Sequence, residues 1–284
     1  MKIKKESYKK RKINDILTNE NIENKKLALE QVLNLSKPEL LLNKNKELTK
    51  KNYKEYKRII KKLNKGLPIQ YITKKANFYG KEYYVNKNTL IPRPETEILV
   101  HKTNQLIEKH MNNKNINILE IGTGSGIIAI TLKKLNKNYN ITATDISKKA
   151  IKVAKKNAKT HNTTITFKKT DLYKGINQKY DIIISNPPYI EENSQNIEKI
   201  VKDNEPKQAL FGGKDGLDYY RRILKDITKI INKNHIIALE IGENQGQKIK
   251  KIIKKYLPKD KIIIKKDYNN YDRYIYIISK DQEK

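Results

Sequence analysis

The spacing of hydrophobic residues changes along the chain and separates three regions. From residue 6 to about residue 66, apolar residues recur every three or four positions, as they do on one face of an amphipathic helix. Breaks in this rhythm fall at Ser36-Lys37-Pro38 and at Gly66-Leu67-Pro68. The region has no strand-like alternation of apolar and polar residues. Residues 1–67 are therefore expected to form a small helical bundle.

Residues 68–91 have a different character, with side chains that favour strands, such as Ile69, Tyr71 and Tyr83. Tyr79-Gly80-Lys81 can form the turn of a hairpin, so this region is expected to be a β-hairpin connector. Two prolines then exclude regular structure before Pro94, which suits the first turn of a helix that runs to about Met111.

From Asn115 onward, strand-like and helical stretches alternate, which predicts a mainly parallel sheet with helices on both faces. The expected fold class is α/β, with a Rossmann-like, seven-stranded domain in residues 92–284. Only a short link separates the last two strands, so these should form an antiparallel hairpin. Helices are expected at Gly126–Leu135, Ser147–His161 and Tyr219–Asn232. Strands are expected at Ile116–Ile121, Asn140–Ala143, Thr164–Lys168, Tyr180–Ser185, His235–Ile241, Lys261–Lys265 and Tyr274–Ile278.

The composition excludes several kinds of protein. The chain of 284 residues has no Cys, which excludes disulfides and thiolate metal sites and fits a reducing cytoplasm. No apolar run approaches the roughly 20 residues that a membrane span needs, and the basic N-terminus lacks the apolar stretch of a secretory signal. The four His residues are scattered without the spacing of metal ligands, so no bound metal is expected.

The net charge of +31 admits two interpretations. A basic surface attracts nucleic acids and other acidic partners. The chain is also rich in Lys, Ile and Asn, which AT-rich codons encode, so mutational bias can supply much of the charge. Residues 1–86 hold 23 of the 62 Lys and Arg residues but 9 of the 31 Asp and Glu residues. The N-terminal third is therefore the more basic part of the chain.

A glycine-rich loop follows the first expected strand of the α/β region. Glycines let a backbone approach a ligand closely and adopt positive φ. A dinucleotide-binding loop would have its third glycine at the position of Ile127, and no Lys-Ser/Thr follows as in a P-loop. An acidic residue on the strand followed by GxGxG points instead to S-adenosylmethionine. The candidate residues are Glu120, Gly122, Thr123, Gly124, Ser125 and Gly126.

Acidic residues also end the next two strands. Asp145 stands where an α/β sheet commonly holds ribose hydroxyls at the carboxyl edge of its strands. Its other interpretation is an N-cap for the following helix, although Ser147 can serve there alone. Asp171 ends the third strand and can accept from an adenine amino group, with Leu172 packing on the ring. A role as a loop cap is an equal alternative for Asp171.

The fourth expected strand runs into Asn186, Pro187, Pro188 and Tyr189. The Asn186 side-chain oxygen and the Pro187 carbonyl can together accept both N–H bonds of a planar amine or amide. Proline has a fixed φ and no N–H, so the carbonyl direction is preset. The Tyr189 ring offers a stacking face. This tetrad predicts a site for a planar nitrogen.

With GxGxG, Asp145 and the tetrad in this order, the chain resembles class I S-adenosylmethionine-dependent methyltransferases that modify planar nitrogens. This group includes DNA adenine, rRNA guanine and protein glutamine methyltransferases, and the tetrad alone does not separate them.

Three further segments resemble one family, the peptide chain release factor glutamine methyltransferases (PrmC or HemK family). They are IPRPETE at 91–97, Glu205-Pro206 with ALFGGKDGLDYYR at 209–221, and LEIG at 239–242 with Gln245-Gly246. PIQYI at 68–72 is similar to the connector of the family. The resemblance covers residue 68 to the C-terminus, and the helical region agrees in size and type only.

The resemblance implies methyl transfer from S-adenosylmethionine to the side-chain N5 nitrogen of the Gln in the Gly-Gly-Gln motif of class 1 release factors. It implies that the tetrad holds the Gln amide. Our hypothesis for the basic N-terminal bundle is that it contacts the release factor outside the Gln loop and adds affinity and specificity. We expect a cytoplasmic monomer that does not bind nucleic acid directly. The alternatives are transfer to a nucleobase of rRNA or DNA, or to a ribosomal-protein glutamine. The resemblance implies that Gly122 to Gly126 and Asp145 hold the cofactor. The full set of candidate cofactor residues is Glu120, Gly122 to Gly126, Asp145, Asp171, Leu172 and Asn186.

Other residues in these segments have open roles. Glu95 and Glu205 are candidates to support the tetrad from behind, and Arg93 is expected to brace the junction between the regions. Gly212, Gly213 and Gly216 can be turns before the next helix or part of a loop that closes over the substrate.

Overall fold

The structure, a computed structural model, describes residues 10–17, 22–111, 115–195 and 197–280. It consists of two compact units, Met1–Lys74 and Lys75–Lys284. The division falls seven residues later than the predicted end of the helical bundle at residue 67. Each unit is built around its own hydrophobic core.

The first unit contains five helices among its described residues: α1 (Ile13–Ile16), α2 (Ile22–Leu33), α3 (Lys37–Leu42), α4 (Lys50–Leu63) and α5 (Ile69–Thr73). Residues 1–9 and 18–21 of the predicted helical bundle lie outside the described residues. Ser36 and Glu39 form a capping box at the start of α3, and Thr49 accepts from the Asn52 N–H at the start of α4. The helical character predicted from periodicity is confirmed.

Helix α5 corrects the expectation that Ile69 and Tyr71 belong to a β-connector. Pro68 fixes the entry to this helix, and the Thr73 hydroxyl donates to the Ile69 carbonyl at 2.9 Å. Ile72 is buried in the core of the helical bundle. Packing against this core outweighs the local β-propensity, because propensity is a weak preference. The hairpin itself is confirmed, and it begins only at β1 (Lys75–Phe78) and β2 (Lys81–Tyr84).

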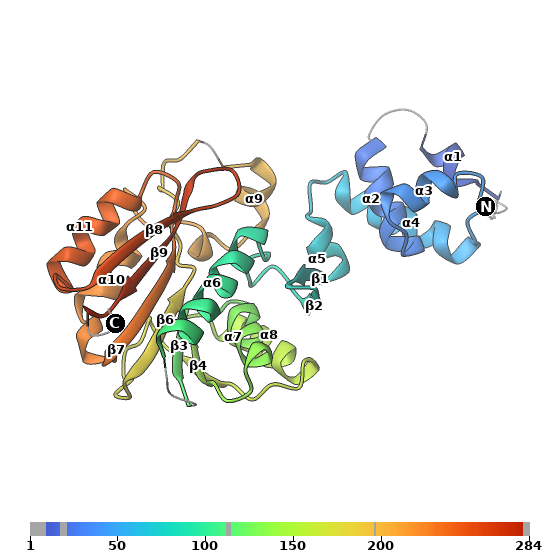
Figure 1. Ribbon diagram of the computed structural model, residues 1–284. Coiled ribbons are helices and arrows are strands. Elements are labelled where there is room, and N and C mark those ends of the chain that lie inside the picture. Colours follow the sequence, from blue (N-terminus) through green and yellow to red (C-terminus); the bar gives the residue numbers. More distant parts are fainter. Residues whose placement is uncertain (1–9, 18–21, 112–114, 196, 281–284) are drawn as a thin grey trace. The chain divides into compact units, whose positions relative to one another are not determined.

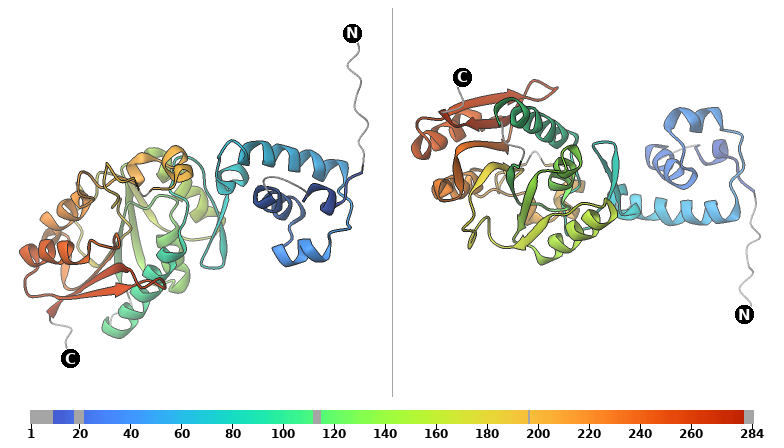
Figure 2. Two further views of the ribbon diagram at one scale, coloured as in Figure 1. Left: turned by 90° about the horizontal axis from the view of Figure 1, so that it is seen from above. Right: turned by 60° about the horizontal axis from the view of Figure 1, so that its bottom comes forward.

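The second unit is a seven-stranded sheet between layers of helices, as predicted (Figures 1 and 2). The strand order is β5-β4-β3-β6-β7-β9-β8, in which β3 to β7 are parallel and β9 runs antiparallel to both its neighbours. The strands are β3 (Asn117–Ile121), β4 (Asn140–Asp145), β5 (Thr166–Lys169), β6 (Tyr180–Ser185), β7 (Ile231–Glu240), β8 (Lys261–Lys266) and β9 (Asp272–Ile278).

Alternate side chains of the central strands enter two different cores. Ile182 and Ile184 of β6 pack with α6 (Pro94–His110), α7 (Ile127–Leu135) and α8 (Lys148–Thr160). Ile183, between them, packs on the other face with α10 (Asp218–Lys225) and α11 (Gly246–Tyr256). Short helices α9 (Lys199–Asn204), η1 (Lys207–Ala209) and η2 (Ile227–Lys229) complete the unit.

In the second unit one predicted helix has a wrong end, and one helix was not predicted. The helix predicted for Tyr219–Asn232 ends at Lys225, because the chain turns through η2 and enters β7 at Ile231, four residues before the predicted strand. Helix α11 was not expected. Its buried residues Ile249 and Ile253 have the i, i+4 spacing of an amphipathic helix, so a signal for it was present in the sequence.

The strand order reverses between β3 and β6, which are adjacent although β4 and β5 intervene in the sequence. At such a switch point the connections leave in opposite directions and open a crevice at the carboxyl ends of the strands. The glycine loop leaves β3, and Asn186 follows β6. The topology thus brings both motifs to one crevice.

Candidate active site at the carboxyl edge of the sheet

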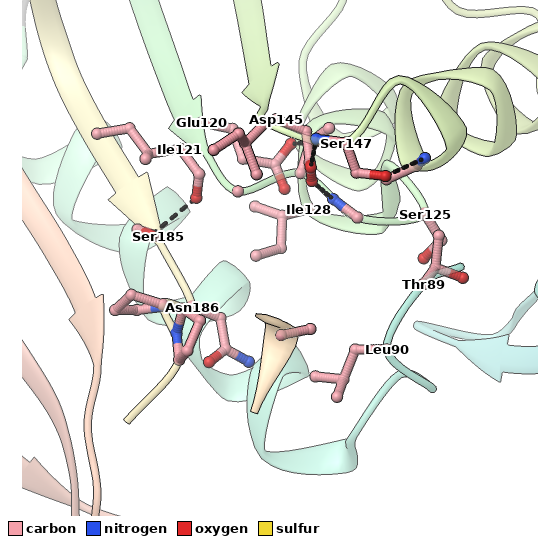
Figure 3. Close-up of a pocket in the computed structure, with 18 of the residues that line it drawn as sticks. Thr89, Leu90, Glu120, Ile121, Ser125, Ile128, Asp145, Ser147, Ser185 and Asn186 are labelled. Atoms are coloured by element: carbon pink, nitrogen blue, oxygen red, sulfur yellow. Dashed lines mark hydrogen bonds between the residues drawn. The ribbon is translucent and has the colours of Figure 1, made fainter. Parts of the chain in front are cut away.

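A cavity occupies the crevice and is lined by segments far apart in the sequence (Figure 3). Glu120, Ile121 and Asp145 come from the ends of β3 and β4, and Ser185 and Asn186 from the end of β6. Thr89 and Leu90 approach from the segment before α6. The Ser185 hydroxyl donates to the Ile121 carbonyl at 2.8 Å, which ties the ends of β3 and β6 together.

The glycine loop is anchored to the neighbouring strand. The N–H groups of Gly122 and Thr123 both donate to the Thr144 carbonyl, at 2.9 and 2.8 Å. Gly122 and Gly124 have φ of 76° and 55°, a region that side chains with Cβ disfavour, and open space surrounds the position of each absent Cβ. Both glycines therefore allow a ligand to approach the loop backbone closely.

Gly126 has a different part in the loop. Its φ is 83°, and a Cβ there would lie 3.1 Å from the Ala154 Cβ on α8. Gly126 does not line the cavity but lets α7 and α8 pack closely. The buried Asn157 of α8 supports the loop by donating to the Ser125 carbonyl at 2.8 Å.

Glu120 presents a buried carboxylate to the cavity. Its Oε2 accepts from the Thr123 hydroxyl at 2.7 Å and from the Ala129 N–H at 3.1 Å. Its Oε1 is buried and has no hydrogen-bond partner within the described residues. Burial raises the pKa of Glu120 to about 8, although hydrogen bonds from Thr123 and Ala129 oppose the shift. Burial without a partner for Oε1 disfavours the ionised form, and a cationic or donating ligand at this atom would stabilise that form.

Asp145 holds the loop and also faces the cavity. Its Oδ2 accepts from the Gly124 N–H at 2.9 Å and its Oδ1 from the Ser147 N–H at 2.8 Å (Figure 3). Ser147 caps α8 by accepting from the Ala150 N–H, as predicted, so Asp145 is not required as the cap. Each carboxylate oxygen keeps a further lone pair for ligand hydroxyl groups.

Asp171 lines the cavity, and its two oxygens accept from the Arg222 guanidinium at 2.7 and 2.6 Å. The expected contact between Asp171 and an adenine amino group stays a prediction. Leu172 also lines the cavity, with a φ of 51° that is uncommon for a residue with a branched side chain. Tyr219, to which the sequence analysis gave no role, also lines the cavity.

Asn186 is held by two residues from other elements. Its Nδ2 donates to the Thr96 hydroxyl of α6 at 3.1 Å, and the Thr96 hydroxyl donates to Glu240 Oε2 at 2.7 Å. Thr96 and Glu240 are both buried. Burial raises the pKa of Glu240 to about 7, while hydrogen bonds from Thr96 and Asn186 and the charge of Arg273 oppose the shift. Sequence analysis missed both supporting residues, although both stand in segments that carry the family resemblance.

The rest of the tetrad is supported from behind. The Gln245 side chain donates to the Tyr189 carbonyl at 2.8 Å and accepts from the Gly242 N–H at 3.0 Å. A Cβ on Gly216 would collide with the Tyr189 carbonyl, and a Cβ on Gly212 with the Pro188 carbonyl. Because these two glycines have no Cβ, the backbone of their loop can pack directly against the backbone of the tetrad. Their expected role in closing over a substrate stays a prediction.

Tyr189 itself does not line the cavity, whereas the other three tetrad residues do. Its ring packs toward the core on the α10 and α11 face of the sheet. Burial raises the pKa of Tyr189 to about 12, so its hydroxyl stays neutral near pH 7.

An ion pair between the partly exposed Arg93 and the buried Glu205 joins two segments of the family pattern. Arg93 Nη2 lies 2.5 Å from Glu205 Oε1, and the Ile91 N–H donates to Glu205 Oε2 at 2.9 Å. Glu205 is buried, so it fixes the 91–93 segment that forms one cavity wall. Arg93 and Glu205 therefore brace the cavity wall. Glu95 is the other residue considered as a support for the tetrad. Its backbone carbonyl accepts a hydrogen bond from the Tyr274 hydroxyl at 2.8 Å.

Comparison with known proteins decides the family. Residues 99–209 match the family "Methyltransferase small domain", and residues 17–73 match "PrmC N-terminal domain". A release factor glutamine methyltransferase of Bacillus cereus is 39% identical over 254 residues, which are 88% of this chain and 90% of that protein. The one of Streptococcus pneumoniae is 38% identical over 91% of this chain and 92% of that protein. The chain belongs to the release factor glutamine methyltransferases.

Solved structures of other methyltransferases share the fold of this family member. A methyltransferase from Pyrococcus furiosus matches 74% of this chain and 93% of its own, with a TM-score of 0.53 and 19% identity. A Thermus thermophilus 16S rRNA N2 G1207 methyltransferase, solved with AdoMet and guanosine, matches 72% of this chain and 50% of its own, with a TM-score of 0.51 and 11% identity. At these identities the likeness concerns the fold alone.

Two features are absent from the part of the chain that the structure describes. No helix in the described residues combines the length and apolarity needed to cross a membrane. These residues also contain no group of three or more His, Cys, Asp or Glu side chains placed to hold a metal ion.

Proposed function

We propose that this protein transfers a methyl group from S-adenosylmethionine to the side-chain N5 nitrogen of the glutamine in the Gly-Gly-Gln motif of class 1 release factors. The observation that carries the proposal is Asn186, held with its amide oriented at the rim of a cavity that begins at the glycine loop. Family membership favours a glutamine side chain over a nucleobase as the source of the planar nitrogen. The relatives that align with nearly the whole chain are release factor glutamine methyltransferases.

The residues of the cavity fit S-adenosylmethionine. The unpaired Glu120 Oε1 suits a positively charged or N–H-bearing group, and Asp145 keeps lone pairs for ribose hydroxyls. Gly122 and Gly124 leave room for a ligand against the loop backbone. We assign Asp171 and Leu172 to the adenine end, and when bound, the cofactor supplies an electrophilic methyl group on a sulfonium.

The tetrad addresses the weak nucleophilicity of an amide nitrogen, whose lone pair is delocalised into the carbonyl group. Acceptors at Asn186 Oδ1 and the Pro187 carbonyl would fix both N–H bonds of the glutamine amide and so direct the lone pair toward the methyl group. They would also stabilise positive charge as it develops on nitrogen. Fixed positioning and preorganised acceptors are each able to lower a barrier by several kcal/mol.

The helical unit is proposed to bind the release factor outside its Gly-Gly-Gln loop. It matches the PrmC N-terminal domain over residues 17–73, and its exposed side chains are rich in Lys. The unit would then contribute affinity and specificity for the intact factor, whereas the second unit performs the transfer.

The decisive experiment is mass spectrometry of a class 1 release factor incubated with the enzyme and S-adenosylmethionine. We expect one added methyl group on the glutamine of the Gly-Gly-Gln peptide. The control is a release factor with Ala in place of that glutamine, which should remain unmodified. Parallel assays with rRNA and ribosomal proteins test the alternatives, and transfer to either of them in place of the release factor would contradict the proposal.

A further inference from the structure

We propose that Thr96 and Glu240 are positioning residues that fix the orientation of the Asn186 amide, so that its oxygen rather than its NH2 group faces the substrate. The inference rests on the proposed function and adds two residues to it. Neither Thr96 nor Glu240 belongs to the Asn-Pro-Pro-Tyr tetrad, and they come from α6 and β7, 90 and 54 positions away in sequence from Asn186.

The sheet register explains why these residues meet. Ser185 of β6 pairs with Leu239 of β7, so Asn186 and Glu240 each follow one residue beyond a paired position. Side chains alternate between the two faces of a strand. Ile184 and Ala238, two residues earlier, both enter the core that α6 covers. Asn186 and Glu240 therefore point to the α6 face, where Thr96 lies in the first turn of the helix.

The hydrogen bonds form a chain with one direction. An ionised Glu240 can only accept, so the Thr96 hydroxyl must direct its hydrogen to Glu240. The Thr96 oxygen is then left as an acceptor, and it receives the Asn186 Nδ2–H at 3.1 Å. The Asn186 amide group also lowers the pKa of Glu240, as an N–H group directed at that carboxylate does. Both neighbours of the Asn186 amide group are thus acceptors, and both select its NH2 end.

A flipped Asn186 amide would place its oxygen against these two acceptors. It would lose its hydrogen bonds in a buried environment and face the substrate with donors. A glutamine amide nitrogen offers only N–H donors, so a flipped Asn186 cannot bind it. Removing the Thr96 hydroxyl should therefore reduce the fraction of enzyme with a productive Asn186, without altering the cavity around the glycine loop.

Glu240 is itself held firmly. The Tyr220 hydroxyl donates to its backbone carbonyl at 2.8 Å, and the Arg273 guanidinium, which opposes the rise in its pKa, donates to the next carbonyl, that of Ile241, at 3.3 Å. These bonds fix the backbone at Glu240, and its buried side chain accepts from Thr96, so the chain of hydrogen bonds starts from a fixed position.

The test is Thr96→Val, which keeps the shape of the side chain and removes the hydroxyl. The full-length variant is compared with the wild-type protein for methyl transfer to a release factor. We expect kcat to fall at least tenfold, with the affinity for S-adenosylmethionine by calorimetry and the KM for the release factor each within about threefold of wild type. Thr96→Ser restores the hydroxyl and should recover most of kcat.

Thr103→Val is the matched control. Thr103 is buried on the same helix, and its hydroxyl donates to the Leu99 carbonyl at 2.7 Å, away from the cavity. It should lose a similar amount of thermal stability but keep its kcat. The proposal is overturned if Thr96→Val turns over like Thr103→Val, if Thr96→Ser is as impaired as Thr96→Val, or if cofactor affinity falls together with kcat.

These outcomes are separable from failure of the proposed function. A wild-type enzyme that does not methylate the release factor would refute the function, and with it this inference. An active wild type accompanied by a fully active Thr96→Val variant would refute the inference alone.

Discussion

The two units of this protein place their charged residues in opposite ways. In the helical unit no charged residue among the described ones is buried as a whole, although Glu30 buries one carboxylate oxygen, and ion pairs such as Arg58–Glu55 join exposed partners. In the second unit Glu120, Glu205 and Glu240 are buried at 1%, 5% and 1% exposure. Each of these carboxylates bonds to groups that surround the cavity.

This contrast separates two kinds of task. Exposed ion pairs contribute little to stability, and their residues can change with small cost, as suits a surface that recognises a partner. Buried carboxylates are costly unless they are paired, so each one fixes the groups around it. We expect changes in the helical unit to act on affinity for the release factor, and changes around the cavity to act on turnover.

The largest effect should come from Asn186→Ala. Loss of an acceptor aimed at developing charge should lower kcat by about 10²- to 10³-fold, measured by transfer of labelled methyl groups to the release factor. Cofactor affinity should largely survive. Asn140→Ala, at an exposed strand start, serves as control and should be unaffected. Normal turnover by Asn186→Ala would contradict the assigned role.

Removal of residues 1–74 should separate recognition from chemistry. We expect kcat/KM for the intact release factor to fall about tenfold or more, equivalent to at least about 1.4 kcal/mol of lost binding. Transfer to a short peptide containing Gly-Gly-Gln should change little, because the cavity and its supports lie in residues 75–284. Circular dichroism verifies that the shortened chain is folded. Equal losses on both substrates would refute the division of tasks.

The buried Glu240 predicts a pH dependence of turnover. Its pKa is raised to about 7 by burial, and a protonated Glu240 no longer requires the Thr96 hydrogen to point toward it. We expect kcat to fall up to about tenfold per unit as the pH drops below 7, and Glu240→Gln should lack this limb. The measurement needs saturating cofactor, so that titration of Glu120, whose pKa is raised to about 8, does not change the fraction of enzyme with bound cofactor. The ionisable groups that act on Glu240, or on which it acts, are Glu95, Arg273, Tyr189, Tyr220, Tyr274 and Tyr276.

The same shift predicts the sign of a stability change. Folding raises the pKa of Glu240 above its ordinary value of 4.5. Its favourable contribution is therefore complete below about pH 4.5 and is lost as the pH rises through 7. The stability of Glu240→Gln relative to wild type should grow between pH 5 and pH 8, by up to about 3 kcal/mol. Denaturant unfolding at both pH values measures it, and a constant difference would contradict the shifted pKa.

A last comparison takes one glycine from each unit. Gly216 has φ of 70° and is crowded by the Tyr189 carbonyl, whereas Gly66 has φ of 77° and nothing within 4 Å of its absent Cβ. Gly66→Ala should cost about 1–2 kcal/mol from backbone strain alone. Gly216→Ala should cost about 1–3 kcal/mol more from overpacking and should also reduce kcat. Equal losses of stability, with unchanged turnover, would show that the loop does not support the tetrad.

Local patterns in the sequence were sufficient to locate the glycine loop and the Asn-Pro-Pro-Tyr tetrad. Asn186 and the glycine loop could be placed at strand ends because proline, glycine and apolar runs have strong local effects. At Ile69–Thr73 the β-propensity of the residues led to a wrong prediction. This segment is a helix, because the helical conformation buries Ile72 in the core of the bundle. The helix at Gly246–Tyr256 was overlooked although its spacing was readable.

The sequence by itself determined the fold class, the tetrad and the loop, because these depend on short stretches of residues. Only the tertiary structure decided that Thr96 and Glu240 hold Asn186, and that Glu205 holds Arg93. These contacts depend on strand order, register and the seating of α6, which arise from long-range packing. A one-residue change of register would turn Glu240 to the opposite face of the sheet, and no local pattern encodes that choice.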